Sequence, residues 1–140
     1  MHPWLLLPCL AAPAQPSPFS GTWALVSAPD MPALIAAATA NLRPADRVEA
    51  RERLTANNPI HRELTLRADP RLVTLAWEGQ SAMRMPMGGR AVPWTGPDGR
   101  KDLVSARLEG SDLVQTLLGE DGMRTCVFRL ENGLLQVRVR

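Results

Sequence analysis

Three methionines alternate along the short segment Met83-Arg84-Met85-Pro86-Met87, and thioethers at alternate positions project from one face of a strand. Soft sulfur ligands favour Cu(I), so this spacing makes copper binding one hypothesis. The other interpretation is that adaptable methionine side chains fill an apolar interior. Pro86 interrupts strand geometry between the second and third methionine. The packing interpretation is therefore favoured, and no metal site is assigned.

His61 and Cys126 are further side chains with catalytic potential. A histidine acts as a general base only beside an oriented partner, and the sequence identifies no partner. Cys126 alternates with Thr125 and Val127, which indicates a buried thiol rather than a nucleophile with a nearby base. The sequence also lacks paired metal-ligand spacing, a glycine-rich phosphate loop and a serine-nucleophile elbow. We therefore assign neither an enzymatic activity nor a cofactor.

The length and charge of the chain limit its partners. Its 140 residues suit one domain that can form its own core. The formal net charge is only +2 and the arginines are scattered, which argues against nucleic acid. No apolar stretch approaches the roughly 20 residues that a membrane span requires. No predicted helix has a basic face opposite a wide apolar face, so a membrane surface is not indicated either.

The first residues are typical of an export signal. A short apolar region runs from Trp4 to Ala12, and Ala12-Pro13-Ala14 matches the small-x-small cleavage pattern. We predict a signal peptide over 1–14, a proline-rich linker over 15–18 and one domain over 19–140, in a periplasmic or secreted protein. No Lys or Arg precedes the apolar region, so either translation starts further upstream or the segment is not a signal. Cleavage would leave Cys126 as the one cysteine, without an internal disulfide.

The domain is predicted to begin with one strand and two helices. Phe19–Val26 has the composition of an opening strand, and the large Trp23 is expected to plug one end of a barrel. Asp30 is a suitable N-cap for a helix from Met31 to about Leu42. Pro44 occupies the favoured first turn of a second helix, which ends near Ala56. The first helix is apolar nearly all round, which suits packing over a barrel mouth.

From Ile60 onward the hydrophobic pattern changes to strict alternation, as in Leu64 and Leu66, and hairpin turn residues separate the strands. The predicted fold is mainly β, an up-and-down antiparallel barrel of about nine strands. Two short helices lie between its first and second strands. An antiparallel barrel closes with an even number of strands. Either the count is off by one, or the barrel is open along one seam.

Both ends of this domain resemble the lipocalin and fatty-acid-binding-protein superfamily, the calycins. Phe19-Ser20-Gly21-Thr22-Trp23 is similar to the opening motif of that superfamily, and Leu108–Gln115 and Phe128–Leu135 resemble its C-terminal strands. The layout from Phe19 onward is closer still to uncharacterised exported bacterial proteins. These have similar residues at the places of Arg53-Leu54 through Asn58-Pro59 and of Trp94-Thr95-x-x-Asp98-Gly99. The resemblance implies a ligand-binding barrel with two helices after its first strand.

The sequence departs from the superfamily pattern in two respects. Fatty-acid-binding proteins hold the ligand carboxylate with an Arg-x-Tyr pair, whereas this chain has no tyrosine and Arg138-Val139-Arg140 does not match. No ligand residue is therefore carried over. The resembling proteins also continue for one strand beyond the position of Arg140. An exposed edge strand is expected, which leaves open homodimerisation through that strand or a truncated gene.

The leading hypothesis is an exported protein that binds a hydrophobic small molecule in an apolar lumen beneath the helices. A cavity of a few hundred Å³ is expected there. The alternative is a structural or interaction barrel with a solid core and a free edge strand. A Cu(I) carrier using Met83, Met85 and Met87 is less favoured. The residues predicted to line the ligand pocket are Leu34, Ile35, Trp77, Met83, Met85 and Trp94.

Overall fold

The computed structural model describes residues 17–140, which form nine strands and two helices in the predicted order. The predicted signal peptide over 1–14, and the start of the linker predicted over 15–18, lie outside the described residues. The elements are β1 Gly21–Ala24, α1 Met31–Ala38, α2 Pro44–Asn57, β2 Glu63–Ala68, β3 Leu72–Trp77, β4 Met83–Pro86, β5 Val92–Thr95, β6 Lys101–Glu109, β7 Asp112–Gly119, β8 Gly122–Glu131 and β9 Leu134–Val139.

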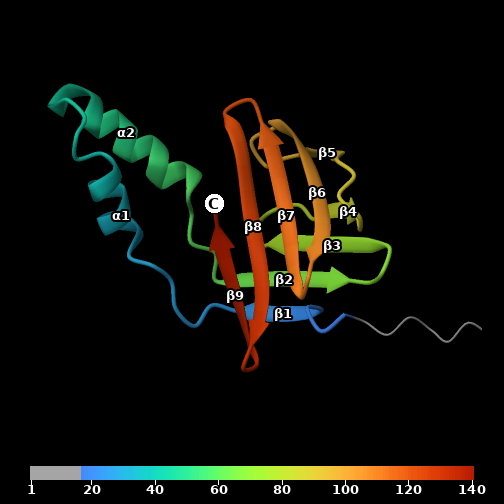
Figure 1. Cartoon of the computed structure of the whole chain (residues 1–140). Coiled ribbons are helices and arrows are strands. Elements are labelled where there is room, and N and C mark those ends of the chain that lie inside the picture. Colours follow the sequence, from blue (N-terminus) through green and yellow to red (C-terminus); the bar gives the residue numbers. More distant parts are fainter. Residues whose placement is uncertain (1–16) are drawn as a thin grey trace, which may run out of the picture.

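The strands form two antiparallel sheets, of order β1-β2-β3-β4 and β5-β6-β7-β8-β9, which cross at a steep angle (Figure 1). The segment after β4 joins them at one seam. There the Met87 N–H donates to the Arg71 carbonyl at 2.8 Å, and the Gly89 N–H donates to the Ala106 carbonyl at 2.7 Å. No strand pairing among residues 17–140 joins β1 to β9 at the opposite seam. The prediction of a mainly β, incompletely closed barrel is confirmed.

The core lies between the two sheets, because alternate side chains of each strand point toward the other sheet. Leu64 and Leu66 of β2 project inward as the sequence predicts, and Phe128 of β8 meets them from the opposite sheet. Ile60, which precedes β2, is largely exposed instead. The buried cluster consists of Phe19, Leu64, Leu66, Ala68, Val73, Leu75, Met83, Met85, Val104, Ala106, Leu113, Cys126 and Phe128.

The aromatic side chain that enters this cluster before β1 is Phe19, whereas the expected plug, Trp23, is only partly buried at its margin. The indole Nε1 of Trp23 donates to the Phe19 carbonyl at 2.9 Å. A tryptophan N–H needs a polar partner, and the backbone beside β1 provides one only at the edge of the core. Two aromatic side chains, Phe19 and Trp23, therefore fill this end of the core together.

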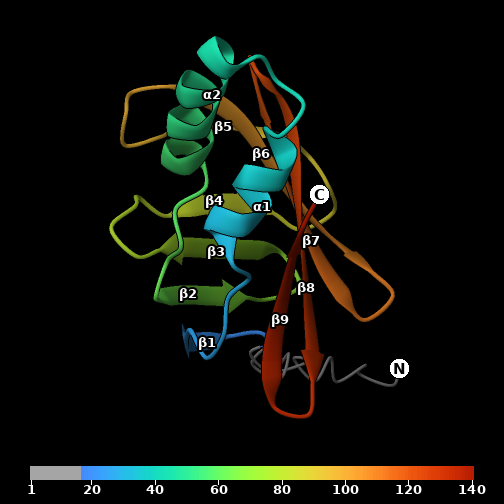
Figure 2. The ribbon, with the colours of Figure 1, turned by 90° about the vertical axis from the view of Figure 1, so that its left-hand side faces the viewer.

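The helices α1 and α2 pack against each other and project from one side of the barrel (Figure 1). Figure 2, which views the molecule from that side, shows α1 in front of β4 and α2 above it, near β5. Asp30 caps α1 as predicted, its Oδ1 accepting from the Ala33 N–H at 3.1 Å. Arg124 of β8 links the sheet to the end of α2 by donating to the Asn57 carbonyl at 3.2 Å. Neither helix in the described part of the chain has the length and apolar content to cross a membrane.

Helix α1 ends at Ala38, before the predicted boundary near Leu42. The buried Thr39 hydroxyl donates to the Ile35 carbonyl at 2.8 Å and accepts from Arg51 Nε of α2 at 3.0 Å. A hydroxyl that satisfies a carbonyl of the last turn competes with continuation of the helix. The turn between α1 and α2 is thus held by side chains from both helices.

Candidate binding site in the barrel interior

The strand residues predicted to line a pocket all reach the barrel interior. Met83 and Met85 of β4 are buried in the core, while Trp77 of β3 and Trp94 of β5 pack against it and are partly exposed. The two sheets therefore bring four of the predicted residues to one shared interior. Their contact with a ligand remains a prediction.

The other two residues predicted to line the pocket, Leu34 and Ile35, lie on α1, which packs against α2. Ile35 is the buried side chain of α1, whereas Leu34 is 53% exposed. A helix that is apolar nearly all round cannot bury every face against one neighbour. Leu34 thus presents apolar surface on the side of the molecule where the helices stand. Its role as pocket lining also remains a prediction.

The end of the interior nearest Phe19 is closed to solvent. The side chains of Leu66, Leu75, Met85, Leu113 and Phe128 have no exposed surface at all. A pocket of about 310 Å³ lies outside this closed end and is mainly apolar; its lining includes Phe19, Pro70, Met87 and Leu108. None of the residues predicted as ligand contacts lines it. Trp77 and Trp94, by contrast, are partly exposed at the margin of the core.

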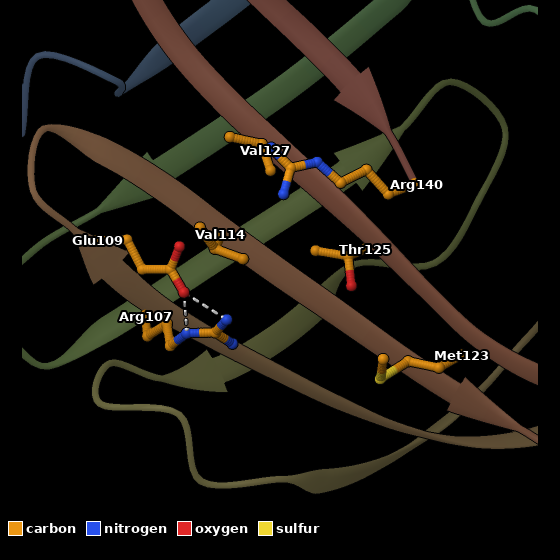
Figure 3. Close-up of a pocket in the computed structure, with 7 residues that line it drawn as sticks. All are labelled: Arg107, Glu109, Val114, Met123, Thr125, Val127 and Arg140. Atoms are coloured by element: carbon orange, nitrogen blue, oxygen red, sulfur yellow. Dashed lines mark hydrogen bonds and ion pairs between the residues drawn. The ribbon is translucent and has the colours of Figure 1, made fainter.

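A second pocket, of about 330 Å³, lies on the outer face of the five-stranded sheet (Figure 3). The residues that line it point away from the core. Val114 and Val127, for example, are next in sequence to the inward-facing Leu113 and Phe128. Arg107 Nε donates to Glu109 Oε1 at 2.8 Å, so a carboxylate of this chain already pairs with that guanidinium. None of the predicted pocket residues lines this depression either.

Aromatic rings connect the rim of the interior to its centre. His61 stacks on Trp77 with ring centroids 5.4 Å apart and an interplanar angle of 28°, and Trp77 lies 6.4 Å from Phe128. His61 is thus a stacking neighbour, and no oriented acid or base partner for it is seen among residues 17–140. Stacked rings form a flat apolar wall of the type that binds hydrophobic ligands.

The sequence analysis missed Gln115, an inward-facing polar residue. Its side chain is 3% exposed, and its Nε2 donates to Met83 Sδ at 3.5 Å. A thioether is a weak acceptor, so this bond recovers little of the cost of burying the amide. The hydrophobic alternation of the sequence could have identified Gln115 as inward-facing, since it lies between the inward-facing Leu113 and Leu117. A polar residue at an apolar position is a candidate for ligand contact.

Asp102 is a second polar residue at an inward-facing position that the sequence analysis missed. It is 5% exposed, and its Oδ1 lies 3.6 Å from Arg100 Nε, which is long for a hydrogen bond. Trp94 stands directly opposite Asp102 in the β5–β6 register. The buried Trp94 Nε1 has no hydrogen-bond partner among the described residues. This part of β5 and β6 therefore carries both a donor and an acceptor that are incompletely satisfied.

The buried thiol of Cys126 on β8 lies opposite Gln115, its register partner on β7. Burial raises the pKa of Cys126, and the nearby Arg124 opposes this only in part. The side chain therefore remains a protonated thiol near neutral pH, consistent with the expectation of an inert cysteine. In the described part of the chain, no group of three His, Cys, Asp or Glu residues is placed to hold a metal ion.

Comparison with known proteins identifies the fold. The chain is similar to the solved structure of the REP1-NXSQ fatty acid transporter, with 14% sequence identity and a TM-score of 0.56 over 86% of this chain and 85% of that chain. A single-residue mutant of the same transporter matches with 14% identity and a TM-score of 0.57, over 86% and 87%. At this identity the likeness shows the fold alone, an incompletely closed antiparallel β-barrel with two helices. No family model matches the sequence, and no curated protein does.

Proposed function

We propose that this protein is exported and binds a hydrophobic small molecule in the barrel interior, at the side where the helices stand. The observation that carries the proposal is the buried amide of Gln115, whose N–H donates to a thioether in an otherwise apolar environment. A ligand carbonyl, hydroxyl or carboxylate would be a better acceptor than sulfur. The fatty acid transporters that share the fold support a hydrophobic ligand.

The apolar body of the ligand would lie against the partly buried Trp77, Trp94 and Leu117, which border the core. Each Å² of apolar surface removed from water contributes about 25 cal/mol to binding. Polar contact with Gln115 would set the orientation, since few polar groups in an apolar pocket usually decide specificity. Residues 1–14 have the composition of a signal peptide, which supports export.

Native mass spectrometry of the protein purified from its own host tests the proposal directly. We expect a bound small molecule that is released on denaturation. In the apo-protein, the dye 1-anilinonaphthalene-8-sulfonate should bind with enhanced emission. The substitution Trp77→Leu should weaken this binding. The exposed Leu118, on the outer face of β7, provides the matched control Leu118→Ala. An empty protein, together with dye binding that responds equally to both substitutions, would refute an interior site.

A second function, an interaction barrel with a free edge strand, is favoured by a different observation. The side chains around Phe128 are fully buried, and β9 has one strand neighbour in the described structure. Copper binding through Met83, Met85 and Met87 has less support, because Met83 Sδ already accepts from Gln115. Unchanged copper binding after substitution of the methionines would exclude that role.

A further inference from the structure

The two sheets have four outer strands, and β9 is the one whose edge lacks protection. β4 contains Pro86 and β5 contains Pro93, and a proline cannot donate to an added strand. β1 is only four residues long and begins at Gly21. Short strands and prolines are the usual means of preventing edge-to-edge pairing. β9 is six residues long and contains neither proline nor glycine.

Backbone groups of β9 are available on the side away from β8. Thr125 and Arg140 exchange both backbone hydrogen bonds, at 3.1 and 2.9 Å, so they form a hydrogen-bonded pair. Such pairs alternate along an antiparallel ladder. The N–H and C=O groups of Leu135, Val137 and Val139 therefore point toward the open seam. Figure 1 shows β9 with β8 on one side and no strand paired on the other.

The same three residues direct apolar side chains toward the barrel interior, because their register partners on β8 include the core residues Cys126 and Phe128. Val137 is nevertheless 40% exposed and Val139 is 58% exposed. Phe128, one strand further in, has no exposed surface. The seam thus leaves both backbone groups and an apolar row of β9 without a covering neighbour in the described structure.

We propose that β9 pairs antiparallel with β9 of a second copy of this chain, about a two-fold axis at Val137. In this register Val137 faces Val137 of the partner subunit, and Leu135 faces Val139 of the partner subunit. The pairing makes roughly six backbone hydrogen bonds, two for each pair of free-edge residues. It also covers the apolar row that the seam exposes. The interface forms whether or not the interior holds a ligand.

Charge selects this register over its neighbours. The outer face of β9 carries Gln136, Arg138 and Arg140. Pairing centred on Val137 places Arg138 beside Gln136 of the partner subunit. Centring the pairing on Arg138 would set that arginine against itself, and like charges directly opposite destabilise a sheet. Centring it on Gln136 avoids the clash but leaves Val139 without a strand residue opposite it.

The interface involves one short strand, whereas stable complexes bury about 800 Å² per partner. We therefore expect a weak, concentration-dependent dimer in sedimentation-velocity experiments. Val137→Pro should raise its dissociation constant more than tenfold, because it removes an N–H that points to the partner and not to β8. Gln136→Glu should tighten the dimer about twofold to thirtyfold through two new pairs with Arg138, and Gln136→Lys should weaken it. Unchanged circular dichroism would show that the variants fold.

Cysteine cross-linking tests the register. In a Cys9→Ser background, Val137→Cys should give a disulfide-linked dimer, since paired Cα atoms lie about 5.5 Å apart, within disulfide range. Leu135→Cys is the matched control, because the two copies of that residue would lie about 13 Å apart along the strands and its register partner on β8 is Leu130. The native Cys126 is buried and should not react. A monomer at every concentration, or equal cross-linking of the two variants, would overturn the proposal.

Discussion

The side-chain amide of Gln115 on β7 donates to Met83 Sδ on β4 at 3.5 Å, and this contact joins the two sheets across the interior. Both side chains are 3% exposed. An apolar pair of the same size would fill the space without the desolvation cost of an amide. The proposed ligand contact would supply the stronger acceptor that Gln115 lacks here.

Gln115→Leu should leave the free energy of unfolding unchanged or raise it by about 1 kcal/mol, because the replacement removes a poorly satisfied buried amide. Binding of a ligand with a polar head should weaken in the same variant. Met83→Leu is the paired control, and it should cost less than about 1.5 kcal/mol, because the two side chains have similar volumes and the lost bond to sulfur is weak. Urea denaturation measures the free energy of unfolding of both variants. A large loss of stability in Gln115→Leu would mean that the amide is structural.

Phe128→Ala should lower the free energy of unfolding by about 3–5 kcal/mol, since it empties the centre of a core with no room to collapse. Phe128 has no exposed surface and lies 6.4 Å from Trp77 between ring centroids. Leu118→Ala, on the outer face, should change stability by no more than about 0.5 kcal/mol. Guanidinium denaturation followed by tryptophan fluorescence checks the pair. Equal effects would contradict the assignment of the inner and outer faces.

Gly119→Ala should destabilise the fold by about 1–3 kcal/mol through overpacking. A Cβ at Gly119 would lie 2.5 Å from Asp102 Oδ1, so the carboxylate would have to leave its buried position. The same glycine substitution in an Asp102→Ala background should cost much less, because the clashing atom is gone. Thermal unfolding of the four proteins completes a double-mutant cycle. Additive effects would show that the two residues do not interact.

Acid should weaken the fold partly through Asp112. Arg129 Nε and Nη2 donate to its two carboxylate oxygens at 2.9 and 2.7 Å, and this hydrogen bonding holds the pKa of Asp112 below its ordinary value despite an opposing effect of desolvation. A carboxylate with a lowered folded pKa contributes stability that is complete above its unfolded pKa, near 3.9. That contribution is lost as the pH falls through the folded value.

Asp112→Asn should therefore flatten the acid limb of the stability profile below about pH 4 while lowering stability slightly at neutral pH. Denaturation midpoints measured across this range provide the test. Asp69→Asn is a useful comparison, since two backbone N–H donors, of Arg71 and Leu72, lower the pKa of Asp69 without a direct ion pair. High salt should reduce the effect of Asp112 more than that of Asp69. Identical salt responses would argue against the ion pair.

Local patterns in the sequence determined much of the fold. Alternating hydrophobic residues such as Leu64 and Leu66 predict strands that bury one face, and hairpin residues predict the meander order. Asp30 and Pro44 predict the helix starts that the structure has. These signals are readable because each depends on residues only a few positions apart. The nine alternating strands also anticipated an open seam.

Tertiary structure alone decided which inward-facing residues meet. Gln115 and Met83 are 32 positions apart, and their contact depends on the registers within both sheets and on the angle at which the sheets cross. A change of register by one residue would turn either side chain to solvent. The same holds for Phe19 in place of Trp23, and for the exposed edge of β9. Periodicity specifies which face a residue takes, but only the packed sheets specify what it faces.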